Sequence, residues 1–183
     1  MTGHPRPGVV LLVAAFALAG CGNASANPGE IATWSNPAGV SPDLVYVTDI
    51  DGFQLQVQSV GVSGDEGLSA TYANLGSGGM VTLTTRRGPD ATAPACGELS
   101  DDTATSGLRC WVADGSVTVV LEGQDGVRPA TLRKAADAVH VPSKDEVKHL
   151  FSEVPAAPDE PVERGDLPEH GDGAPIDEPG PGG

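Results

Sequence analysis

The apolar residues of this chain change their spacing once, near residue 129, and this change limits the fold more than any other feature. Before it, short β-rich runs alternate apolar and polar residues, as in Phe53–Gln58. A period of two is typical of a strand with one buried face and one wet face. After it, Leu132, Ala136 and Val139 recur at helical spacing. Strands followed by helices predict an α+β domain.

Turn signals separate the β-rich runs. Asp114-Gly115 between two such runs is a strong hairpin signal, and Gly76–Gly79 is a glycine-rich turn. A long polar loop is expected over residues 86–107. The runs that favour strands cover residues 44–47, 53–58, 68–73, 80–85, 108–112 and 116–121. They predict a small antiparallel sheet of about five strands.

The helical part carries its own start and stop signals. Pro129 suits the first position of a helix, and Pro142 disfavours helical backbone at the residue before it, so the first helix should end near His140. Ser143 and Glu146 have the spacing of a capping box, which predicts a second, shorter helix ending near Glu153. One or two C-terminal helices should therefore back the sheet, in a domain over residues 42–153.

Residues 1–20 have the pattern of a signal peptide. A basic start with Arg6 precedes the apolar run Val9–Leu18, which contains no charge. This run is about half the ~20 residues that a helix needs to span a bilayer, so a signal peptide is favoured over a transmembrane helix.

The end of this segment, Leu18-Ala19-Gly20-Cys21, resembles the lipobox of bacterial lipoproteins. The resemblance implies attachment of diacylglycerol to the Cys21 thiol, followed by cleavage just before that residue. An ordinary signal peptide that happens to end near a cysteine is the alternative. Two acyl chains are enough for stable anchoring, so we expect a protein held by Cys21 on the outer face of the cell membrane. Other small actinobacterial lipoproteins are loosely similar in their C-terminal hairpin and helix.

Polar segments are expected on both sides of the domain. Residues 21–41 are rich in Gly, Pro, Asn and Ser without an apolar period, which predicts a flexible tether. Residues 154–183 consist largely of Pro, Gly and acidic residues, which predicts a disordered acidic tail.

Lipidation of Cys21 leaves Cys96 and Cys110 as a pair. Export would place them in an oxidising compartment, where disulfides persist. A metal or catalytic thiol is the alternative, but two cysteines without a nearby histidine fall short of a zinc site. A Cys96–Cys110 disulfide would attach the long polar loop to the sheet. Trp111 should then point to the opposite face from Cys110, where we expect it to be a buried anchor of the core.

The acidic net charge of the chain limits the classes of partner that we expect it to bind. It has 25 acidic residues against 10 lysines and arginines, for a formal net charge of −15. Nucleic-acid binding depends on clustered basic residues, so we expect no nucleic-acid partner. Membrane attachment should be hydrophobic, through the lipid on Cys21.

We find no catalytic, cofactor or metal motif in the sequence, and expect none of these sites. Asp49–Gly52 has the start of a calcium loop but runs into a strand, which favours an ordinary turn. Gly76–Gly79 lacks the Lys-Ser/Thr and the helix of a phosphate-binding loop. His140 and His149 are interpreted as surface residues near helix ends.

These features favour a binding or interaction module of the cell envelope, whose partner is an envelope protein or a small or lipidic ligand held between sheet and helix. An envelope hydrolase with a site assembled from scattered residues is one alternative. A surface spacer with an acidic tail is another.

Overall fold

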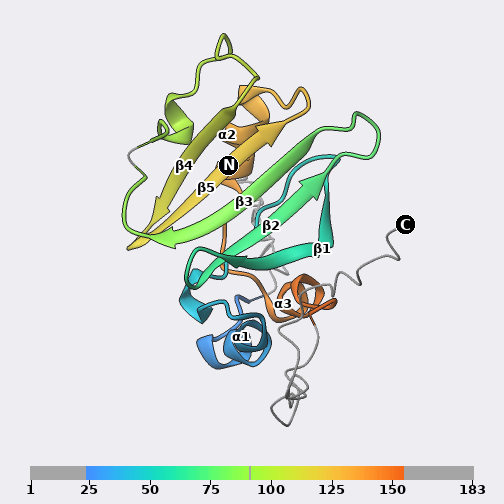
Figure 1. Ribbon diagram of the computed structural model, residues 1–183, viewed down its shortest axis with the longest axis vertical. Coiled ribbons are helices and arrows are strands. Elements are labelled where there is room, and N and C mark those ends of the chain that lie inside the picture. The colour runs from blue at the N-terminus through green and yellow to red at the C-terminus, as the bar shows by residue number, and fades with distance from the viewer. Residues whose placement is uncertain (1–23, 91, 155–183) are drawn as a thin grey trace, which may run out of the picture.

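The computed structural model describes residues 24–90 and 92–154 (Figure 1). The signal peptide, the lipidation of Cys21 and the acidic tail were predicted for parts of the chain that lie outside these residues.

A five-stranded antiparallel sheet forms the centre of the fold, as predicted. The strands are β1 (Gln54–Ser63), β2 (Gly67–Ala73), β3 (Met80–Arg87), β4 (Leu108–Asp114) and β5 (Val117–Gln124). Their order in the sheet is β1-β2-β3-β5-β4, so the β4–β5 hairpin joins the first three strands through β5. β1 contains an irregularity between Gln56 and Gly61, where it has more residues than the facing part of β2.

The two predicted C-terminal helices are present as α2 (Pro129–Asp137) and α3 (Lys144–Leu150). Pro129 occupies the start of α2, and Ser143 caps α3. The Ser143 hydroxyl accepts a hydrogen bond from the Glu146 amide, and the Glu146 carboxylate accepts one from the Ser143 amide. No helix of the described residues is both long enough and apolar enough to cross a membrane.

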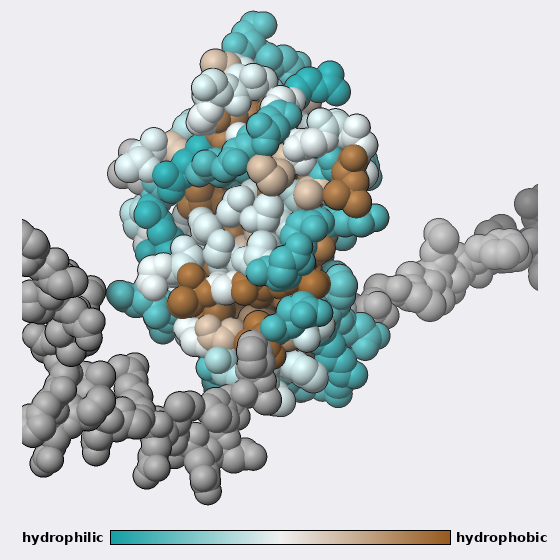
Figure 2. All heavy atoms as spheres, turned by 45° about the vertical axis from the view of Figure 1, so that its right-hand side comes forward, coloured by the Kyte–Doolittle hydropathy of each residue, from teal (hydrophilic) through white to brown (hydrophobic). Residues whose placement is uncertain are grey.

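One face of the sheet packs against the helices and forms the core. In Figure 1, α2 lies behind the sheet, and α3 lies beyond its lower end beside the N-terminal helix. The inward-facing residues of the central strands are fully buried, as are the largest apolar residues of α2 and α3. These residues are Leu68, Ala70, Val81, Leu83, Val119, Leu121, Leu132, Val147 and Leu150. The opposite face of the sheet is more polar and carries a hydrogen bond between the Thr71 and Thr82 hydroxyls. Figure 2 shows hydrophilic and neutral residues over most of the visible surface, with hydrophobic residues in separate patches.

The predicted flexible tether over residues 21–41 is wrong for residues 24–41, which are folded onto the domain. They contain α1 (Pro28–Ser35) and a 3-10 turn at Asn36–Ala38. Asn27 and Glu30 form a capping box, and the Ala26 amide donates to the Pro142 carbonyl at 2.9 Å. Ile31 and Val40 are 3% and 1% exposed. The helix is too short to show a clear period, and these contacts with distant residues stabilise it instead.

The predicted strand at residues 44–47 is also wrong. A 3-10 turn covers Pro42–Leu44, and Val47 makes only an isolated bridge, to His140. Residues 44–48 are all buried between the sheet and the helices. Their side chains form a continuous apolar run because the segment is buried on all sides. A short run of this kind has the same sequence pattern as a buried strand.

The Cys96–Cys110 disulfide is present and ties the long loop after β3 to β4. Cys96 begins a 3-10 turn (Cys96–Glu98), and Ala95 pairs with Trp111 in a parallel bridge along the edge of β4. Trp111 points away from Cys110, as predicted, but it is only half-buried and does not anchor the core. Its indole Nε1 donates to the Ala93 carbonyl, so it supports the loop instead.

The same loop contains a buried carboxylate, Asp90, on the outer face of the sheet. It accepts hydrogen bonds from the Thr92 hydroxyl at 2.6 Å and the Thr92 amide at 2.8 Å. Arg109 and Arg86 lie 3.0 Å and 3.3 Å from its oxygens. The Thr92 hydrogen bonds lower the pKa of Asp90 below its usual value, and the two guanidinium groups lower it further, against the effect of burial.

We predict that Asp90 contributes stability at neutral pH that is lost in acid. Because its pKa is lower in the folded chain, the contribution is complete well above pH ~4, the ordinary aspartate pKa, and disappears as the pH falls through that value toward the native pKa. Urea unfolding from pH 7 to pH 2 should show Asp90→Asn less stable than wild type at pH 7, with a difference that shrinks below pH ~4. A difference that stays constant over this range would contradict the prediction.

We also predict that α1 is part of the cooperative unit. Ile31→Ala should lower the free energy of unfolding by about 2–4 kcal/mol, because it leaves a cavity where a buried side chain was. Thr33→Ala, on the exposed side of the same helix, is the control and should change it by less than about 0.5 kcal/mol. Equal, small effects in chemical denaturation would mean that residues 24–41 are only loosely attached.

Candidate ligand-binding site

Residues 45–53, here called the connecting segment, pass between the sheet and the C-terminal helices. Val47 exchanges two backbone hydrogen bonds with His140, each 3.0 Å long. The buried Thr48 hydroxyl donates to the Ala135 carbonyl of α2, and its amide donates to the Tyr72 hydroxyl of β2. These contacts fix the segment, and a cavity opens on each side of its turn at Asp51-Gly52.

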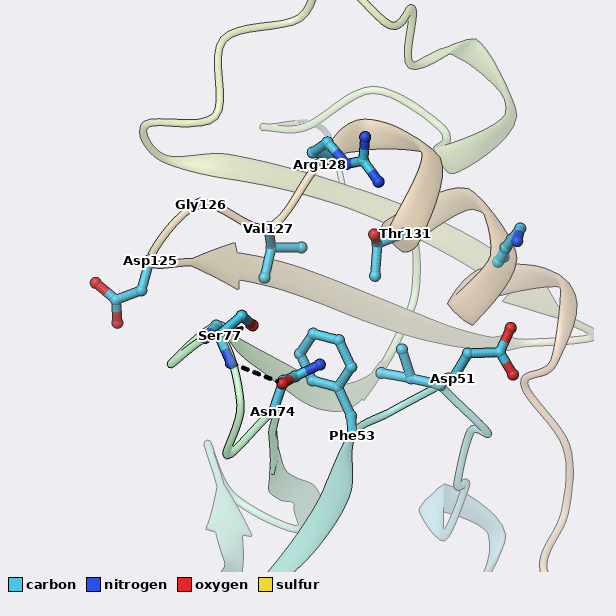
Figure 3. Close-up of a pocket in the computed structure, with 12 residues that line it drawn as sticks. Asp51, Phe53, Asn74, Ser77, Asp125, Gly126, Val127, Arg128 and Thr131 are labelled. Carbon is cyan, nitrogen blue, oxygen red and sulfur yellow. Dashed lines mark hydrogen bonds between the residues drawn. The ribbon is translucent and has the colours of Figure 1, made fainter.

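The first cavity, here called the Phe53 cavity, has a volume of about 390 Å³. It lies between the connecting segment, the β2–β3 turn, the β5–α2 turn and α2 (Figure 3). Figure 3 shows the Phe53 ring between the turn that carries Asn74 and Ser77 and the side chain of Thr131 on α2. The lining residues are Ile50, Asp51, Phe53, Asn74, Ser77, Gly79, Asp125, Gly126, Val127, Arg128, Thr131 and Lys134.

Local backbone geometry shapes two walls of this cavity. The Asn74 side-chain oxygen accepts hydrogen bonds from the amides of Gly76 and Ser77, which holds the β2–β3 turn closed (Figure 3). Gly123 lets the β5–α2 turn fold over the end of the sheet, since a Cβ there would lie 2.8 Å from the Val127 side chain. Asp125, with φ of 53°, is the one non-glycine residue with positive φ in the described ranges.

The charged groups around the Phe53 cavity are of both signs. Asp51 and Asp125 are acidic, and Arg128 and Lys134 are basic. None of the four forms an ion pair with another residue of the described part of the chain. In Figure 3, Asp51 and Arg128 lie on opposite sides of Thr131, whereas the Asp125 carboxylate points away from the Phe53 ring. The cavity therefore combines an aromatic surface with charged groups of both signs at its border.

The second cavity lies on the other side of the connecting segment and has a volume of about 670 Å³. Its lining includes Leu55, Tyr72 and two residues of α3, Glu146 and His149. Burial raises the pKa of Tyr72 to about 12, so its hydroxyl keeps its proton at neutral pH.

Beside this second cavity, three titratable side chains lie together. Side-chain ligand atoms of Asp49, His140 and Glu146 are all within 4.8 Å of one another. Burial lowers the pKa of His140, but the Ala138 carbonyl and the Glu146 carboxylate raise it to a net value above the usual one. Burial raises the pKa of Glu146, while hydrogen bonds from Ser143 and the contact with His140 bring it below its usual value.

The sequence predicted some of these positions and missed others. Asp49–Gly52 is a turn, as predicted, but it also forms a wall of both cavities. The turn at Gly76–Gly79, rejected as a phosphate-binding loop, contributes Ser77 and Gly79 to the Phe53 cavity. His140, interpreted as a surface residue, is half-buried beside two carboxylates: that of Glu146, six residues later, and that of Asp49, from a distant part of the chain. No local spacing could have shown that Asp49 lies beside this pair. The predicted disulfide residues, Cys96 and Cys110, line neither cavity.

No protein-family model, curated protein or solved structure matches the chain.

We predict that Thr48 holds the connecting segment in place. Thr48→Val keeps the side-chain shape but removes the buried hydroxyl that donates to the Ala135 carbonyl, which then keeps only the Ala138 amide at 3.2 Å. It should lower the free energy of unfolding by about 0.5–1.5 kcal/mol, the net contribution of one hydrogen bond. It should also speed hydrogen exchange of the Val47 amide. Thr84→Val, at a half-buried position on the outer face of the sheet, is the control and should be near neutral. Equal exchange rates at Val47 in both variants would count against this role.

Proposed function

We propose that the protein is a lipid-anchored binding module on the outer face of the cell membrane, and that its ligand is a small zwitterionic molecule held in the Phe53 cavity. The observation that carries the proposal is a cavity that contains an aromatic ring and is bordered by charged side chains of both signs, which have no ion-pair partners in the described residues.

The lining of the Phe53 cavity indicates the chemistry of the ligand. Arg128 and Lys134 suit a carboxylate, and Asp51 suits an ammonium group. Phe53 and Ile50 provide apolar surface for the part of the ligand between these groups, and Thr131 provides a hydroxyl. A free acyl chain would bury these charged groups without partners, so the proposal favours a polar ligand over a lipidic one.

Two features support the cellular location in the proposal. The lipobox resemblance at Leu18–Cys21 implies an anchor, and the Cys96–Cys110 disulfide is typical of a protein exported to an oxidising compartment.

The proposal also implies an orientation. Ser25 is four positions after Cys21 and pairs with Ser143 at the start of α3. Four residues span at most about 14 Å when fully extended, so a lipid on Cys21 would hold the end with α1 and α3 close to the bilayer. In Figure 1, α2 lies toward the opposite end of the sheet, so the Phe53 cavity beside it would be farther from the membrane.

A native mass spectrum of the protein, gently solubilised from its own membrane, tests the proposal. We expect a small retained ligand on the wild-type protein and on Leu75→Ala, whose exposed side chain lies in the β2–β3 turn but does not line the cavity. Phe53→Ala should weaken retention by about tenfold or more, because it removes the apolar surface on which the ligand packs.

The same spectrum gives the mass of the lipid on Cys21. Wild-type protein without a retained small molecule would overturn the proposed ligand, as would equal retention in Phe53→Ala and wild type. A Cys21 thiol without acyl chains would overturn the proposed anchor.

A further inference from the structure

Asp49, His140 and Glu146 come from three separate segments that the fold holds together. Asp49 follows the two backbone hydrogen bonds that join Val47 to His140. Glu146 lies in the first turn of α3, where the capping box with Ser143 fixes it. The backbone on both sides of the cluster is therefore anchored, while the Asp49 side chain is exposed and makes no ion pair within the described residues.

The hydrogen bonds of His140 determine which of its ring nitrogens can bind a ligand. Nδ1 lies 2.8 Å from the Ala138 carbonyl oxygen, which can only accept, so Nδ1 carries a proton. Nε2 lies 3.1 Å from Glu146 Oε1. A neutral imidazole would thus direct its Nε2 lone pair at a carboxylate oxygen, an arrangement that needs a cation between them: a proton or a metal ion.

Glu146 is held in a similar way. The Ser143 amide donates to Oε2 at 2.7 Å, which leaves Oε1 directed toward His140. Histidine and carboxylate ligands of metals are usually oriented by such hydrogen bonds on their non-ligating atoms. His140 and Glu146 both already make such a hydrogen bond, through Nδ1 of His140 and Oε2 of Glu146.

The distances and the surroundings suit a metal ion. Tetrahedral zinc ligands with bonds of about 2.0–2.2 Å lie about 3.3–3.6 Å apart, so the Nε2–Oε1 pair is nearly at the required spacing. Rotation of the Asp49 side chain would bring the third ligand closer. Glu146 borders two open cavities, of about 670 and 500 Å³, so water or a ligand atom could complete the coordination.

The structure assigns to Asp49, His140 and Glu146 a binding site for a divalent transition-metal ion, with His140 Nε2 and one oxygen of each carboxylate as ligands. The imidazole favours Zn²⁺ and related ions over Ca²⁺ and Mg²⁺, which prefer oxygen ligands alone. Binding would displace the proton between His140 and Glu146. The site is separate from the Phe53 cavity and does not depend on the proposed ligand.

Calorimetric titration of the full chain with Zn²⁺ tests this assignment, together with NMR of the His140 ring. We expect one equivalent of Zn²⁺ to bind and to shift the Nε2 resonance of His140. His140→Ala, Asp49→Asn and Glu146→Gln should each weaken this binding by at least about tenfold. Glutamine also serves in a capping box, so Glu146→Gln should keep the start of α3 intact.

A matched control comes from a carboxylate outside the cluster and outside the cavities. Asp65 is exposed in the turn between β1 and β2, so Asp65→Asn should bind Zn²⁺ as wild type does. Absence of the one-to-one binding in wild type would overturn the assignment. Binding that all three ligand substitutions leave unchanged would also overturn it.

Discussion

The Val47–His140 pair of backbone hydrogen bonds joins the connecting segment to the chain between α2 and α3. Around this junction, Leu44, Val45 and Val47 are buried, and the Thr48 hydroxyl satisfies a carbonyl of α2. A buried segment without sheet partners must have its polar groups satisfied in another way, since an unpaired group costs about 1–3 kcal/mol. The connecting segment meets this requirement by bonding to β2, to α2 and to the α2–α3 connection, and so links the sheet to the helices.

Both candidate sites follow from this arrangement. Both cavities are lined by Ile50, Asp51 and Phe53, which follow the part of the connecting segment that these hydrogen bonds fix. The backbone pairing at Val47 also places Asp49 near His140, and the capping box of α3 adds Glu146. Rigid backbone with a few converging polar side chains is the usual construction of a binding site.

The folded N-terminal segment changes how the domain would sit on a membrane. A flexible tether of twenty residues would let the domain move freely above the bilayer. With Ser25 paired to Ser143 and Ala26 bonded to Pro142, only Gly22–Ala24 would separate a lipidated Cys21 from the domain. The exposed Trp34 of α1 belongs to this end of the molecule, where an amphipathic ring suits a membrane interface.

Sequence patterns predicted the five-stranded antiparallel sheet, the first half of β1, the starts of α2 and α3, the β4–β5 hairpin and the Cys96–Cys110 pairing. Each depends on residues close together, such as the alternation in Phe53–Gln58, or on simple elimination among three cysteines. Only the tertiary structure showed that α1 is docked, that residues 44–47 form a buried segment rather than a strand, and that Trp111 supports a loop. It alone brought Asp49 to His140 and Glu146, and Phe53 to Thr131. Local patterns record which face of an element is buried, whereas these contacts join residues far apart in the chain, whose proximity depends on how the elements pack.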